Sequence, residues 1–175
     1  MDYLEFAAEH SIEGNTLSGV VHVFGTTSKS VQKGSYHRFE PTAFDDSIKS
    51  GRVLAFYAHD TSKPLAKPSL SIQDGKLHYS LTLGSQSYAN DLRENMANGL
   101  MNSMSFGVTS GKYRTERNPD GSVTRVHSRA NLYDISPVAQ GDFEGTEALL
   151  HSATADRRAD MARARFRVAK EAQRT

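Results

Sequence analysis

The chain has 175 residues, of which 37% are hydrophobic and 23% are charged, and this composition suits one globular domain with its own core. It contains no cysteine, which excludes disulfide bonds, a thiolate nucleophile and cysteine-based zinc sites. No apolar run approaches the roughly 20 residues that a membrane span needs, and the first residues lack the basic start and apolar segment of a secretion signal. We therefore expect a protein that is made and used in a cytoplasm, without a membrane partner.

The net charge of +1 is unevenly distributed along the chain. Residues 156–175 carry seven Arg and Lys side chains against three Asp and Glu, so the rest of the chain is net acidic. We predict a basic helix over about 155–173, within an extension, residues 151–175, to a domain of residues 1–150. Such a tail is typical of a solvated helix or of a segment that docks on an acidic partner. The acidic body argues against nucleic acid as a partner.

Two strands are predicted near the start of the chain, over residues 4–9 and 17–25, because both stretches are rich in strand formers. His22 lies among valines, so we interpret it as a strand residue and not as a ligand. Residues 40–51 predict a short helix, with a proline near the first turn, acidic residues early and a glycine at the end.

The next segment, residues 52–58, is almost entirely apolar, which predicts a strand buried on both faces. It ends abruptly at His59 and Asp60. A histidine at the end of a core strand is well placed for proton transfer, although the same position also suits a histidine that is simply held by a carbonyl.

A hairpin is predicted around Asp74 and Gly75, between strands at 70–72 and 76–83. In the second strand His78 is expected to face solvent. The residues expected to face inward are Leu77, Tyr79, Leu81 and Leu83.

A helix over 85–98 is predicted to lead directly into a strand at 99–108. Side chains alternate along a strand, so Ser103 and Ser105 share one face. The opposite face is apolar and carries Met104, Phe106 and Val108.

The last predicted strand covers residues 122–137. Its outward face is expected to carry a basic row of Arg125, His127 and Arg129. Without a bulge, Leu132, Asp134 and Ser136 share one face, while His127, Arg129, Tyr133 and Ile135 share the other. Six or more strands with few helices predict a strand-rich barrel or sandwich with helices attached.

A serine hydroxyl is a poor nucleophile at neutral pH, so it needs a base to remove its proton and a third group to fix the tautomer of that base. Ser105, His59 and Asp134 can supply these three roles. The chain holds seven histidines and many serines, so this chemistry alone does not select the set.

Several segments, taken in order over about residues 15–140, resemble the tailed-phage prohead (capsid maturation) proteases, which are related in fold to the herpesvirus assembly proteases. The matching segments are Gly19–Phe24, Phe39–Phe44, His59-Asp60 followed by Lys63–Ala66, Asp74–Leu77, Gly99-Leu100 with Ser103–Gly107, and Leu132–Val138. The resemblance implies a mainly β (α+β) fold, a closed or partly open β-barrel surrounded by a few helices.

The same resemblance implies that His59 is the general base and that Ser105, directly before Phe-Gly, is the nucleophile. Strand geometry does not choose between Ser105 and Ser103. Asp134 is the expected third member, although the family often has glutamate there and the related viral enzymes use a second histidine. His127 is therefore the alternative, and the alternation of side chains places it on the other face.

The implied activity is a serine endopeptidase that needs no metal or cofactor. It would cut the scaffold, or the scaffolding segment of the major capsid protein, and itself, inside the immature capsid (prohead) in the host cytoplasm. Self-association is a further expectation, since the related viral enzymes act as dimers. A non-catalytic capsid-assembly or scaffold protein that kept the protease fold is the alternative.

Overall fold

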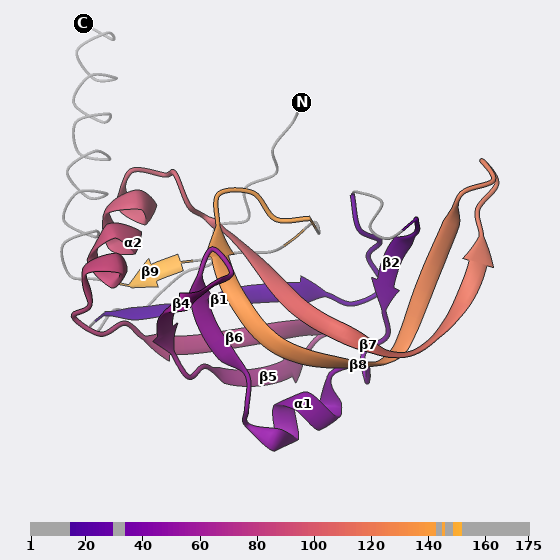
Figure 1. The fold of residues 1–175 in the computed structure, drawn as a ribbon, viewed down its shortest axis with the longest axis horizontal. Helices are drawn as coiled ribbons and strands as arrows, with labels where there is room; N and C mark the ends of the chain where they lie inside the picture. Colours follow the sequence, from indigo (N-terminus) through magenta and orange to yellow (C-terminus); the bar gives the residue numbers. More distant parts are fainter. Residues whose placement is uncertain (1–14, 30–33, 143–144, 146–148, 152–175) are drawn as a thin grey trace, which may run out of the picture.

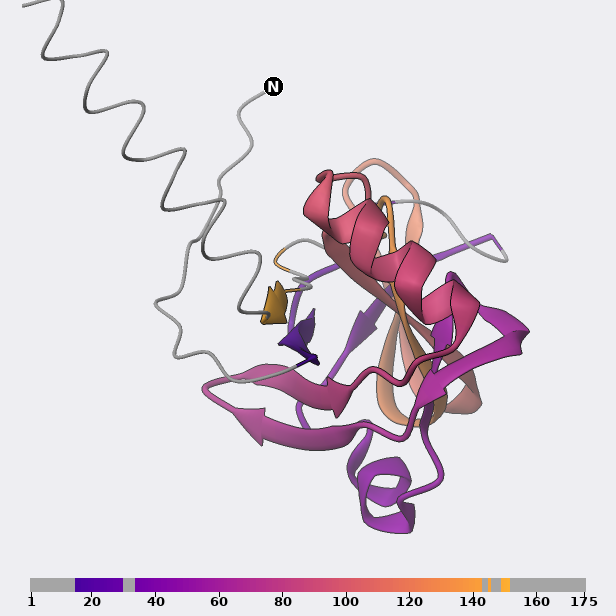
Figure 2. The same ribbon diagram turned by 90° about the vertical axis from the view of Figure 1, so that its left-hand side faces the viewer.

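A computed structural model of the chain describes residues 15–29, 34–142, 145 and 149–151. The strand expected at residues 4–9 and the basic helix expected over 155–173 lie outside these ranges. Two sheets and two helices make up the described part (Figures 1 and 2).

The first sheet has four strands in the order β5-β6-β1-β9, and all its neighbours are antiparallel. Its strands are β1 (Thr16–Val23), β5 (Ser69–Gln73), β6 (Lys76–Thr82) and β9 (Leu149–His151). The predicted hairpin joins β5 to β6, and the backbone of both Asp74 (φ 49°) and Gly75 (φ 71°) is left-handed. Two left-handed residues match the right-handed twist of the flanking strands, which is why Asp-Gly favours this tight turn.

The second sheet is built around β8 (Val123–Val138), a long strand that pairs antiparallel with β7 (Ser103–Arg117) along nearly its whole length. Figure 1 shows the two as curved neighbouring strands that cross the molecule. Two short strands, β2 (Tyr36–Phe39) and β3 (Leu54–Tyr57), each pair parallel with β8. Because β7 occupies one edge of β8, β2 and β3 lie one after the other along its opposite edge. The sheet continues beyond β3 with β4 (Asp60–Ala66).

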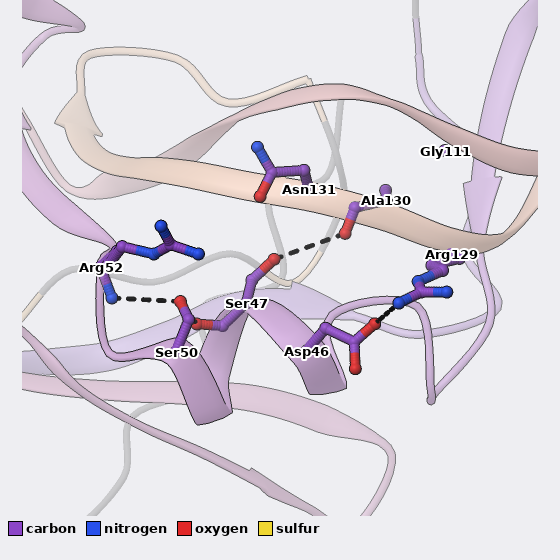
Figure 3. A pocket seen from close by; sticks show the side chains of 8 residues that line it. All are labelled: Asp46, Ser47, Ser50, Arg52, Gly111, Arg129, Ala130 and Asn131. Carbon is purple, nitrogen blue, oxygen red and sulfur yellow. Dashed lines mark hydrogen bonds and ion pairs between the residues drawn. The ribbon is translucent and has the colours of Figure 1, made fainter.

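Helix α1 (Asp45–Ser50) closes the gap that β2 and β3 leave along the edge of β8. Its buried Ser47 accepts a hydrogen bond from the Leu132 amide (2.9 Å) and donates one to the Ala130 carbonyl (3.5 Å; Figure 3). Figure 1 shows α1 below the sheets and α2 (Ser87–Ala97) at their left-hand end, where it faces the viewer in Figure 2. Neither described helix is long and apolar enough to cross a membrane.

One hydrophobic core joins both sheets and the inner face of α2. The row predicted to face inward on β6 is buried, while His78 is only partly buried. The apolar face predicted for residues 103–108 also packs on this core, through the buried Met104 and the partly buried Phe106 and Val108. Among the largest side chains in the core are Phe39, Phe44, Leu17, Leu77, Leu92 and Ile135.

The mainly β fold with few helices is as expected, and its described strands form two sheets that are not closed, so a barrel is not confirmed. Other expectations need correction. Leu54 is 40% exposed, so the strand after Arg52 is not buried on both faces, and the chain after His59 continues as β4, which was not expected. His127 is buried and does not belong to an outward basic row.

Candidate active site

The hairpin of β7 and β8 places two serines and a carboxylate on one face of the second sheet. Ser105 is the register partner of Ser136, and Gly107 is the partner of Asp134. Directly paired residues of antiparallel strands point to the same side of the sheet, so these side chains are neighbours. The expectation that Asp134 and Ser136 share one face agrees with this pairing, which also puts Ser105 on that face.

A β-bulge at Tyr133 is what turns Asp134 toward this face. Leu132 pairs with Val108 and Asp134 pairs with Gly107, which leaves Tyr133 as an extra residue on β8. An unbroken strand would put Leu132 and Asp134 on the same side, but the bulge sends Leu132 into the core and Asp134 to the opposite face. The expectation that these two residues share a face was made for a strand without a bulge, and the bulge reverses it.

His59 lies in a two-residue turn between β3 and β4 whose backbone is left-handed at both positions. The φ angle is 49° at Ala58 and 63° at His59, although neither residue is glycine. This conformation costs roughly 1–2 kcal/mol per residue, so the surroundings must hold it in place. Two hydrogen bonds to β8 do so: the Ala58 amide donates to the Pro137 carbonyl (3.3 Å) and the His59 amide donates to the Ser136 hydroxyl (3.1 Å).

The turn brings the His59 ring against the carboxylate of Asp134. Nδ1 of His59 lies 2.8 Å from Oδ2 of Asp134. Asp134 is 1% exposed, whereas the His59 side chain is 39% exposed, so the pair has one buried end and one end open to solvent. With Nδ1 engaged by a carboxylate, Nε2 is left to accept a proton, which is the arrangement that a general base requires.

Ser105 lies beside this pair on the neighbouring strand. Its side chain is partly buried, and its hydroxyl makes no hydrogen bond with another described residue. Its register partner Ser136 accepts the hydrogen bond from the His59 amide. The structure therefore brings His59 into contact with Asp134 and places Ser105 on the same face, one strand away.

Two further residues of the site had no role in the sequence analysis. The hydroxyl of Ser136 also donates to Oδ2 of Asp134 (3.2 Å). A Cβ at Gly107 would overlap Oδ1 of Asp134 and the ring of Tyr133, so only glycine leaves room for the carboxylate. Alternation along the strand placed Ser136 on the same face as Asp134. The turn at His59, whose amide bonds to the Ser136 hydroxyl, has no recognisable pattern in the sequence.

His127, the alternative third member, belongs to a different cluster. Its Nε2 lies 2.9 Å from Nδ1 of His37, and its ring stacks on Phe39 with the centroids 4.7 Å apart. Burial, helped by the nearby charges of His37 and Arg125, lowers the pKa of His127 to about 4. Its hydrogen bonds and ring contacts do not involve His59.

Asp60 follows His59 directly but does not pair with it. Its carboxylate binds the amide and hydroxyl of Ser62 and forms an ion pair with Lys63 (3.1 Å). These contacts, led by the Ser62 hydroxyl, lower the pKa of Asp60. Asp134 is therefore the carboxylate that the described structure offers to His59.

A separate pocket of about 280 Å³ lies between α1 and β8 (Figure 3). Its walls include Ser47, Arg52, Arg129 and Asn131, and none of the three predicted catalytic residues lines it. In the described part of the chain, no group of three or more His, Asp or Glu side chains is arranged to hold a metal ion.

Comparison with known proteins gives one match. Residues 3–160 match the family model described as caudovirus prohead serine protease. No curated protein and no solved structure matches the chain.

Proposed function

The chain belongs to the caudovirus prohead serine protease family, and from this membership we propose that it is an endopeptidase with Ser105 as nucleophile, His59 as general base and Asp134 as the acid that orients the base. Family membership makes it a serine peptidase with a role in capsid maturation. The observation that carries the residue assignment is the 2.8 Å contact between His59 and Asp134. Asp134 lies on β8, the strand that pairs with the part of β7 that holds Ser105.

In the proposed mechanism the proton on Nδ1 of His59 stays hydrogen-bonded to Asp134. Nε2 takes the proton of Ser105 while its oxygen attacks the scissile carbonyl carbon, and the imidazolium then gives this proton to the leaving amine. Water repeats the sequence on the acyl-enzyme and releases the new carboxyl group. The left-handed turn at His59 supports this assignment, because strained backbone held by its surroundings is typical of functional sites.

As a prohead protease, the enzyme acts on phage capsid components. We propose that its substrates are the scaffold or the scaffolding segment of the major capsid protein, and the protease itself, and that cleavage takes place inside the prohead in the host cytoplasm. Self-association and docking of the basic extension, residues 151–175, belong to the same proposal.

Serine substitution in β7 tests the assignment. Ser105→Ala, co-expressed with the capsid precursor of the same phage, is expected to leave the precursor uncut, because the substitution removes the hydroxyl that is paired with Ser136 beside the His59–Asp134 contact. Ser103→Ala is the matched control, since this serine lies two residues away on the same strand and the same face, and it is expected to cut at the wild-type rate. Gel electrophoresis and intact-mass measurement of the products give the readout.

Two results would contradict the proposal. Unchanged processing by Ser105→Ala would remove Ser105 from the nucleophile role. Failure of the wild-type chain to cut the precursor inside assembled proheads would favour the alternative of a non-catalytic assembly protein.

A further inference from the structure

Ser136 is a completely buried serine in the middle of β8 whose hydroxyl is fully used. It accepts the amide proton of His59 (3.1 Å) and donates its own proton to Oδ2 of Asp134 (3.2 Å). A hydroxyl has one proton to donate, so these partners fix its orientation. Ser136 is 0% exposed and already donates its hydroxyl proton to Asp134, which excludes it as the serine that attacks a substrate.

The first of these bonds holds the backbone of His59. Ala58 and His59 both adopt left-handed backbone, which non-glycine residues keep only where neighbours hold them. The amides of the two residues bond to neighbouring positions of β8, Ala58 to the carbonyl of Pro137 and His59 to the hydroxyl of Ser136. Only the second bond uses a side chain, so it is the one that a substitution can remove.

The second bond holds the carboxylate of Asp134. Its Oδ1 has no hydrogen-bond partner among the described residues, so His59 and Ser136 alone fix it, both through Oδ2. Without the Ser136 hydroxyl, the hydrogen bond to His59 would be the one that remains, and the carboxylate could change its orientation relative to the imidazole ring. One hydroxyl thus sets the position of both the backbone and the acid partner of the same imidazole.

We propose that Ser136 is a positioning residue of the peptidase, which orients the His59–Asp134 pair toward Ser105 without touching the substrate. This inference rests on the proposed function. A misplacement of about 1 Å in catalytic groups can cost roughly 100-fold in rate, so loss of this hydroxyl should reduce activity far more than its effect on folding would suggest.

The test compares Ser136→Ala with Ser47→Ala. Ser47 is also a buried serine whose hydroxyl bonds to the backbone of β8, but it lies in α1 and forms no hydrogen bond with His59 or Asp134. The readouts are the rate at which a fluorophosphonate labels Ser105, the free energy of unfolding in urea, and the NMR signal of the proton on Nδ1 of His59.

We expect Ser136→Ala to be labelled roughly 10- to 100-fold more slowly than wild type and to broaden or lose the Nδ1 proton signal. Ser47→Ala should be destabilised to a similar degree but keep the wild-type rate and signal. Ser136→Cys, which nearly preserves volume but hydrogen-bonds weakly, gives the same loss as alanine and serves if alanine does not fold. Ser136→Thr, which keeps the hydroxyl, should recover part of the rate.

Equal labelling rates for wild type and a folded Ser136 variant, with the Nδ1 signal intact, would overturn this inference and leave the proposed function standing. Absence of labelling at Ser105 in the wild-type protein would instead overturn the proposed function. In that case the Nδ1 signal still decides whether Ser136 holds the pair.

Discussion

At the scale of single residues, the carboxylate of Asp134 combines deep burial with an uneven use of its two oxygens. Oδ2 takes hydrogen bonds from both His59 and Ser136, whereas Oδ1 has no partner among the described residues. A buried carboxylate needs partners to offset the loss of hydration. The ring of His59 is therefore part of what makes this carboxylate tolerable in the fold, and the two groups depend on each other.

Replacing Asp134 with asparagine tests this dependence. The amide keeps the shape of the carboxylate, but it no longer selects the tautomer of His59 that carries its proton on Nδ1, so Nε2 loses its ability to accept a proton from Ser105. We expect Asp134→Asn to fold and to slow cleavage and fluorophosphonate labelling by about 10³- to 10⁴-fold, as in the serine-protease precedent for the equivalent change.

The control is His127→Phe, which preserves the stacking on Phe39 and should leave the rate unchanged. If Asp134→Asn worked at the wild-type rate while His127→Phe did not, the orienting role would pass to His127.

At the scale of elements, alternation along β7 could be predicted and alternation along β8 could not. Residues 103–108 form a regular part of β7, so counting by twos placed Ser105 and Met104 on opposite faces, in agreement with the observed pairing. The pairing skips Tyr133 and Ser128 on β8, and between Thr109 and Lys112 two residues of β7 lie opposite Ala130 alone. Each of these irregularities reverses the sides that counting assigns. A bulge depends on both strands, so the sequence of one strand does not reveal it.

The turn that carries His59 was out of reach of sequence reasoning for a similar reason. Alanine seldom adopts left-handed backbone, histidine does so only as a minority conformation, and no glycine, asparagine or proline marks the turn. The energy that stabilises it comes from β8, which is more than 70 residues away in the chain. The resemblance named His59 and gave Asp134 as its expected partner, but the backbone conformation that brings the two side chains together could not be predicted.

Helix α1 gives the prediction at this scale. Removal of the Ser47 hydroxyl leaves the buried amide of Leu132 without its acceptor and the carbonyl of Ala130 without its donor. Ser47→Ala is expected to lower the free energy of unfolding by about 1–3 kcal/mol, the usual cost of an unsatisfied buried amide, and urea denaturation measures it. Surface substitutions usually change the free energy of unfolding by less than about 0.5 kcal/mol. A change this small for Ser47→Ala would show that the packing of α1 does not depend on this hydrogen bond.

At the scale of the whole molecule, His22 lies where the two sheets and α1 meet. Its ring contacts Phe24, Phe39, Phe44 and Phe106, with centroids 5.2–6.3 Å apart. These aromatic rings come from segments far apart in the sequence, so the cluster connects most of the core. Burial lowers the pKa of His22 to about 4, the same value that His127 reaches.

These two histidines predict how the stability of the protein depends on pH. In the unfolded chain each has a pKa near the ordinary value of about 6.5, so between about pH 6.5 and pH 4 the unfolded state binds protons that the native state does not. The free energy of unfolding should therefore be fully retained above pH 6.5 and fall as the pH drops toward 4. The limiting slope is about 1.4 kcal/mol per pH unit for each histidine.

Urea denaturation at a series of pH values measures this slope, and His22→Phe isolates the share of the aromatic cluster. Phenylalanine keeps a ring among the neighbouring rings but takes up no proton, so the variant should lose roughly half of the slope that the two histidines contribute between pH 6.5 and 4. Above pH 7 neither protein should show a slope from these groups. Identical slopes for the two proteins between pH 6.5 and 4 would contradict this prediction, because they would mean that His22 takes up a proton as readily in the native protein as in the unfolded chain.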